Sequence, residues 1–104
     1  MKFLTQLEVW QAMAKAYKHF SDTRVRGGHS KFLVDTTCGL CFATTALYRD
    51  ERISEKTAIV IKKKIKKELV RKDCIDYLAA YTPEGAKVRV EFCKRMIKEL
   101  KRNR

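Results

Sequence analysis

The sequence predicts an all-α protein, a small four-helix bundle with one short extended segment near Phe32. Two observations predict this class. Apolar residues recur at three- and four-residue steps in four segments, and period-two alternation is almost absent. The segments are joined by short connections, which favours helices packed around one core. A chain of 104 residues with 45% hydrophobic content can supply one modest core, so we expect a single domain over residues 1–104.

The first expected helix runs from Phe3 to Phe20 and carries a stripe rich in aromatic side chains. A small bundle needs large side chains to fill its core, so core packing is one interpretation of this stripe. The alternative is that Trp10 and Tyr17 are exposed and bind a partner. An exposed stripe would also suit a symmetric homodimer.

The helical pattern stops over residues 21–30, where Gly27 and Gly28 interrupt it, and we expect a flexible loop there. Arg24 and Arg26 precede the two glycines, so the segment resembles a single RGG unit. A mobile Arg-Gly segment can lie along phosphates or stack on bases. An ordinary polar loop is the alternative.

The segment Phe32-Leu33-Val34 predicts a short strand or a buried extended stretch. A second helix should follow, with Asp35, Thr36 or Thr37 as its N-cap and an end near Asp50.

The third expected helix runs from about Glu55 to Lys72, with Ser54 as its N-cap. One side of it is apolar, and basic residues gather on the far side. The basic residues are Lys56, Lys63, Lys64, Lys67 and Arg71.

Thr82-Pro83-Glu84 predicts the start of the last helix, with threonine as N-cap, proline at the first helical position and an acid in the first turn. The helix should continue to about Leu100. Residues 73–81 link it to the third helix and could hold a short helical turn.

Charge is the most informative functional feature of the chain. It has 24 basic and 12 acidic residues, a net charge of +12. Residues 53–104 hold 16 basic and 7 acidic residues, a net +9, whereas residues 1–52 hold 8 and 5, a net +3. A positive surface in the second half would suit nucleic acid or an acidic protein. The alternative is a solvated helix face that only keeps the protein in solution.

Two cysteine hypotheses point to other chemistry. Cys38-Gly39-Leu40-Cys41 has the spacing of a thioredoxin-like redox motif, but the chain lacks the alternating strands and helices that would place it on a βαβ unit. The same pair could form half of a zinc site completed by His29 and Cys74. A strong zinc signal would show two close pairs of ligands, and this chain has only one, Cys38 and Cys41. We therefore expect no metal, no cofactor and no enzymatic activity.

Arg89 is an anomaly, because helical steps from Glu84 place it on the same face as the apolar Cys93 and Met96. A guanidinium there must be paired or must reach out to solvent. Glu68 is a possible partner in a structural pair. The alternative is a partner-binding arginine that lines a groove between the last two helices.

From residue 39 to about residue 97, the order of features resembles small uncharacterised bacteriophage proteins. The features that carry the resemblance are Gly39-Leu40-Cys41, Ile53-Ser54, Tyr77-Leu78, Gly85, Arg89 and Phe92-Cys93. The resemblance implies a virus-encoded accessory protein and supplies no activity. It also implies structural roles for the cysteines within a helical framework.

These features favour a non-enzymatic binding protein that docks on nucleic acid, or on a nucleoprotein machine, through the lysine-rich helix and the Arg24–Arg26 loop. The alternative is an inhibitor or adaptor that binds an acidic host protein through an apolar groove, with the charge steering association. No apolar stretch approaches the roughly 20 residues that span a bilayer, so we expect no membrane partner and a cytoplasmic location, in the host cell if the protein is viral.

Overall fold

The computed structural model describes residues 2–37, 39–69 and 82–103. The described part is mostly helical and has one two-stranded sheet, which confirms the mainly helical class that the sequence predicts.

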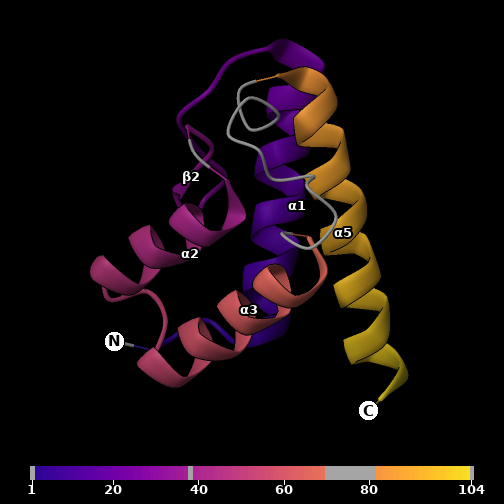
Figure 1. The fold of residues 1–104 in the computed structure, drawn as a ribbon. Helices are drawn as coiled ribbons and strands as arrows, with labels where there is room; N and C mark the ends of the chain where they lie inside the picture. Colours follow the sequence, from indigo (N-terminus) through magenta and orange to yellow (C-terminus); the bar gives the residue numbers. More distant parts are fainter. Residues whose placement is uncertain (1, 38, 70–81, 104) are drawn as a thin grey trace.

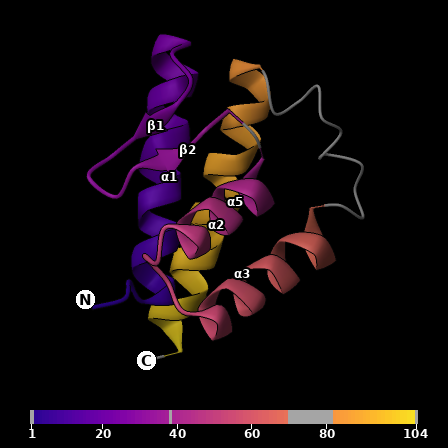
Figure 2. The ribbon, with the colours of Figure 1, turned by 90° about the vertical axis from the view of Figure 1, so that its left-hand side faces the viewer.

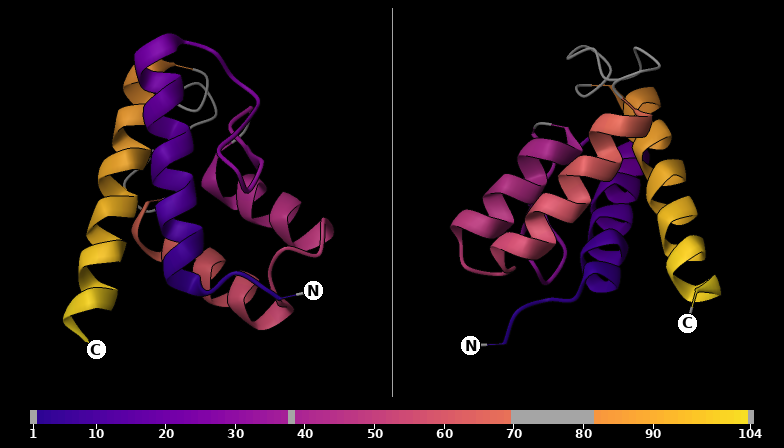
Figure 3. Two further views of the ribbon diagram at one scale, coloured as in Figure 1. Left: turned by 180° about the vertical axis from the view of Figure 1, so that it is seen from behind. Right: turned by 60° about the horizontal axis from the view of Figure 1, so that its bottom comes forward.

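The helices of the described residues form two antiparallel pairs. The long pair consists of α1 (Gln6–Thr23) and α5 (Pro83–Arg102), which run in opposite directions along most of the molecule (Figure 1). The shorter pair consists of α2 (Leu40–Arg49) and α3 (Glu55–Glu68), which lie side by side and cross in front of α1 (Figure 3). The short pair therefore has one face toward the long pair and one face toward solvent.

A capping box sets the start of α1. The Thr5 hydroxyl accepts from the backbone N–H of Glu8 at 3.1 Å, and the Glu8 carboxylate accepts from the backbone N–H of Thr5 at 2.9 Å. The second bond lowers the pKa of Glu8, because it favours the charged carboxylate. The helix thus begins after Phe3, later than predicted, and it ends at Thr23.

The expected loop over residues 21–30 is partly regular structure. Its first residues belong to α1, and its last residues include β1 (Gly28–His29), which pairs antiparallel with β2 (Val34–Asp35). The buried Thr36 closes this hairpin, since its hydroxyl accepts from the N–H of Gly27 and donates to the carbonyl of Gly27, each at 2.9 Å. Phe32, where a strand was expected, lies in the turn of the hairpin.

The predicted N-caps of α2 are wrong. Gly39 occupies the N-cap position and makes no side-chain capping bond. The carboxylate of Asp35 instead accepts from the backbone N–H and the hydroxyl of Thr37, while Thr36 is used in the hairpin. These polar side chains are therefore engaged in other hydrogen bonds and do not cap α2.

The starts of α3 and α5 are as predicted. The Ser54 hydroxyl accepts from the N–H of Thr57 at 3.2 Å, and the Thr82 hydroxyl accepts from the N–H of Gly85 at 3.0 Å. Helix α5 runs past the predicted end near Leu100. The predicted end of the third helix and the link over residues 73–81 lie outside the described residues.

The core is one cluster of apolar side chains from both helix pairs. Between α1 and α5, the rings of Trp10 and Phe92 meet edge to face, with centroids 5.6 Å apart and planes at 78°. The Trp10 indole N–H donates to the Gln6 side chain at 3.2 Å, so its polar atom is satisfied. From the short pair, Leu40, Leu47, Ile61 and Ile65 are fully buried in the same cluster.

Candidate nucleic-acid interface

Helix α3 separates an apolar face from a basic face. Ala58, Ile61 and Ile65 are buried. Lys56, Lys63, Lys64 and Lys67, which we call the lysine face, are all exposed. At a rise of 1.5 Å per residue, the lysine face extends about 16 Å along the helix.

The charge of the lysine face is uncompensated within the described residues. No acidic residue lies between Glu55 and Glu68 in the sequence. Elsewhere, exposed lysines do have acidic partners, as in the pairs Lys18–Asp22 at 3.0 Å and Lys94–Glu91 at 3.9 Å. Among the ion pairs formed by residues 2–37, 39–69 and 82–103, none includes a member of the lysine face. Positive potential is thus concentrated along one exposed helix surface.

The lysine face also borders a hollow of about 380 Å³. Among the described residues, Val60, Lys63, Lys64 and Lys67 line it. The half-buried Val60 adds apolar surface, to which the alkyl stems of lysines can contribute, while their ammonium groups stay in water. This surface can therefore contact apolar groups as well as anions.

The two loop arginines do not join the lysine face. Arg24 is the C-cap residue of α1 with a φ of 63°, and both Arg24 and Arg26 are exposed. The segment between α1 and β1 lies at the upper left of Figure 2, whereas the whole of α3 lies at the lower right. The predicted composite surface is therefore two separate basic regions. Arg71 lies outside the described residues.

The structure corrects the interpretation of Trp10 and Tyr17 as partner-binding residues. Both side chains are 0% exposed. They face the interior because α5 covers their side of α1. The first aromatic stripe is thus core, apart from Phe3, which is 49% exposed.

Arg89 is also fully buried, so its side chain does not line an open groove. Its guanidinium donates to the carbonyl of Gly85 at 2.9 Å. A Cβ atom at Gly39 would lie 3.5 Å from the same guanidinium, which places it beside the start of α2. The expected partner Glu68 instead pairs with Arg95 at 3.7 Å. The buried guanidinium of Arg89 therefore lies in the interior between α5 and the start of α2, where it contacts both.

The described cysteines are not in reactive environments. Burial raises the pKa of the Cys93 thiol well above its ordinary value. Partial burial also raises the pKa of Cys41, against the opposing effect of the positive charges of Lys66 and Lys62. Cys38 and Cys74 lie outside the described residues, and no group of three or more potential metal ligands occurs within the described part.

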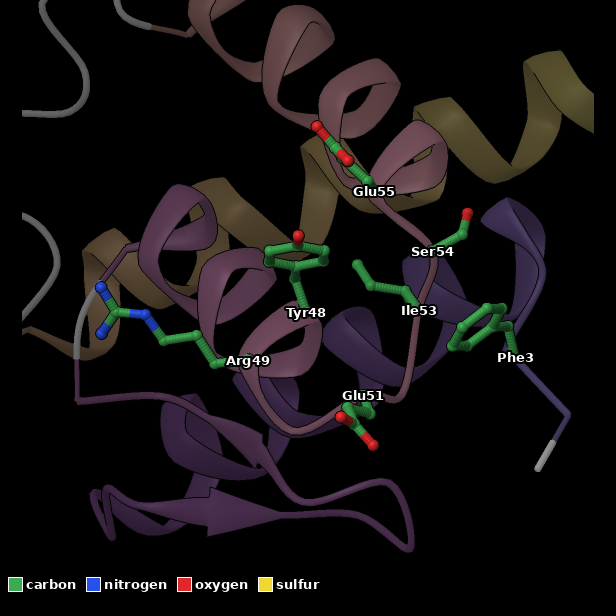
Figure 4. A pocket seen from close by; sticks show the side chains of 7 residues that line it. All are labelled: Phe3, Tyr48, Arg49, Glu51, Ile53, Ser54 and Glu55. Carbon is green, nitrogen blue, oxygen red and sulfur yellow. The ribbon is translucent and has the colours of Figure 1, made fainter.

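A second hollow, of about 650 Å³, was not predicted from the sequence. It lies where the turn between α2 and α3 meets the N-terminal segment, and Tyr48, Ile53 and Phe3 form a row along it (Figure 4). Its lining also includes Arg49, Glu51, Ser54 and Glu55. Tyr48 is 42% exposed in this hollow. The left-handed backbone of Glu51, with a φ of 59°, belongs to a turn that the sequence does not reveal.

Comparison of the chain with protein-family models, with curated proteins and with solved structures gives no match. None of the helices in the described ranges is both long and apolar enough to cross a membrane.

Proposed function

We propose that this protein is a non-enzymatic nucleic-acid-binding module that docks through the lysine face of α3. The observation that carries the proposal is an exposed row of lysines without acidic partners among the described residues. Such a row neutralises phosphates and releases counterions, which gives binding that depends on salt and little on sequence. Lysine is a point charge rather than a planar fork, so it suits phosphate contacts better than base reading.

The proposed scaffold is a small helical bundle in which the α1–α5 pair supports the α2–α3 pair. Burial of Ile61 and Ile65 fixes the rotation of α3 and holds the lysine face toward solvent. The loop with Arg24 and Arg26 is a separate, secondary contact in this proposal. A virus-encoded accessory role rests on the resemblance over residues 39–97 alone.

The test is a charge-reversal variant in which Lys63, Lys64 and Lys67 are replaced by glutamate. Its affinity for nucleic acid should fall below detection at moderate salt, while its circular dichroism and thermal unfolding stay close to those of the parent protein. Folding should survive because the three side chains are exposed and contribute little to the core.

A matched control reverses three exposed lysines of α5, Lys87, Lys98 and Lys101, and changes the net charge equally. This variant should retain most of the affinity. Equal losses in both variants would mean that only net charge matters, and unchanged binding by the α3 variant would refute the proposed interface.

A second candidate is an adaptor that binds an acidic protein, and the hollow beside Tyr48 and Phe3 favours it over a purely electrostatic surface. Affinity capture from bacterial lysate, with and without nuclease, separates the two candidates. A stoichiometric protein that persists after nuclease treatment would support the adaptor. Loss of captured material on nuclease treatment would support the nucleic-acid module.

A further inference from the structure

We propose that the ligand of this surface is single-stranded nucleic acid, with phosphates on the lysine face of α3 and a base stacked on Phe42 of α2. This inference rests on the proposed nucleic-acid function and narrows its ligand. The observation behind it is an exposed aromatic ring on the helix beside the lysines.

Phe42 points away from the core. On α2, the buried residues are Leu40, Ala43, Thr44 and Leu47. These residues occupy one face of the helix, and Phe42 lies on the opposite face with 60% of its surface exposed. An aromatic side chain contributes little to folding in this position, since most of its surface remains in water.

The ring and the lysines share one outer surface. Helices α2 and α3 lie side by side and both bury their inner faces in the same core, so their outer faces point the same way (Figure 3). Lys62 and Lys66, which are not part of the lysine face, lower the pKa of Cys41, so the first turn of α2 lies near the middle of α3. Phe42 lies one helical step of about 100° from Cys41, toward the outer face of α2. Ile59, 52% exposed on α3, adds apolar area to the same helix pair.

A surface with both cations and an exposed ring matches the chemistry of a single strand. A duplex stacks its bases internally and offers mainly phosphates to a surface that does not enter a groove. A single strand offers phosphates and unstacked bases together, and stacking on an aromatic ring tolerates any base. An acidic peptide would satisfy the lysines without using the ring as a stacking platform.

The test compares one labelled strand of about 20 nucleotides, longer than the ~4–16 nucleotides that single-strand-binding folds commonly cover, with the same strand annealed to its complement. The strand is tested both as DNA and as RNA, because either one could supply the phosphates and unstacked bases. At equal salt, the parent protein should bind at least one single strand more tightly than the duplex. Phe42→Ala should weaken that binding at least about fivefold, the lower range for a base–aromatic stack, and should leave duplex affinity within about twofold.

Two controls isolate stacking. Phe42→Leu keeps an apolar side chain without a ring and should behave like Phe42→Ala, whereas Phe42→Trp should restore binding. Val88→Ala removes an exposed apolar side chain from α5 and should have no effect. Because Phe42 is exposed, all variants should remain folded.

The outcomes separate this inference from the proposed function. If single strand and duplex bind equally and Phe42→Ala changes neither, the inference is wrong, while loss of binding in the α3 charge-reversal variant would still uphold the lysine face. If neither nucleic acid binds, both proposals fail. Binding of a polyglutamate peptide as tightly as the strand would also overturn the single-strand assignment.

Discussion

Arg89 is charged but fully buried, so its role is to stabilise the fold rather than to bind a partner at the surface. Its guanidinium is buried between α5 and the start of α2 and donates to the carbonyl of Gly85. The helical spacing alone predicts that it faces inward. Its contact with the start of α2 could not be predicted, because it depends on how the short helix pair packs against α5.

Arg89→Ala should lower the free energy of unfolding by about 2–5 kcal/mol, because it removes a large side chain from the interior. Arg95→Ala is the comparison, since Arg95 is about half exposed and its pair with Glu68 should contribute less than about 1 kcal/mol. Urea unfolding measures both. A stable Arg89→Ala protein with weakened nucleic-acid binding would contradict the structural role.

Cys93 and Cys41 should differ in reactivity toward a thiol reagent at mildly alkaline pH. Burial raises the pKa of both thiols, so each has less thiolate than a free cysteine at the same pH, and Cys93 is also sealed from solvent. In variants that keep only one of the four cysteines of the chain, Cys93 should react only on unfolding, whereas Cys41 should react slowly in the native protein.

Lys62→Gln and Lys66→Gln should slow the labelling of Cys41 further, because these lysines lower its pKa. Rapid labelling of Cys93 in the folded protein would contradict its placement in the core.

Two helix starts, those of α3 and α5, were predicted from local caps, whereas the equally local capping box formed by Thr5 and Glu8 at the start of α1 was missed. The N-caps of α3 and α5 were predicted from Ser54 and Thr82 because each hydroxyl bonds within its own first turn. The start of α2 was missed because Gly39 has no side chain to signal it. Of the nearby polar residues, Asp35 accepts hydrogen bonds from Thr37, and Thr36 bonds Gly27 across the hairpin, so none of them caps α2.

Substitutions at Gly39 should change stability in a defined order. A Cβ atom there would make only an ordinary contact, 3.5 Å from Arg89, so a side chain fits. Gly39→Ser should be more stable than the parent protein by a few tenths of a kcal/mol, because it adds the missing cap. Gly39→Asp should gain up to about 1 kcal/mol, since its carboxylate also faces the positive end of α2.

Gly39→Ala completes this series as a control, since alanine is a poorer N-cap than glycine and should destabilise the protein. The variants are compared by urea unfolding. A Gly39→Asp protein less stable than Gly39→Ala would contradict the described start of α2.

The lysine face of α3 was predictable from the sequence because its position depends only on the helical period and on an apolar stripe strong enough to fix the rotation. Phe42 was not predictable, because its exposure depends on which face of α2 meets the long helix pair. Tertiary packing also buries Trp10 and Tyr17, whereas the local sequence pattern does not decide between a core and an exposed position for them.

On the scale of the whole molecule, the α1–α5 pair forms the base and the α2–α3 pair forms the outer layer that carries the proposed interface (Figure 1). A net charge of +12 attracts polyanions to the entire protein, but contacts with individual phosphates require side chains without acidic partners. The central claim is therefore that particular lysines of α3, rather than the overall charge, contact the phosphates.

The dependence of affinity on salt tests this claim most directly. For the parent protein and for the variant with Lys63, Lys64 and Lys67 replaced by glutamine, the logarithm of the affinity for a single strand is plotted against the logarithm of the salt concentration. Each phosphate contact contributes about 0.7 to the slope, so the variant should have a slope smaller in magnitude by about 2. Equal slopes for the two proteins would contradict the assignment of phosphate contacts to α3.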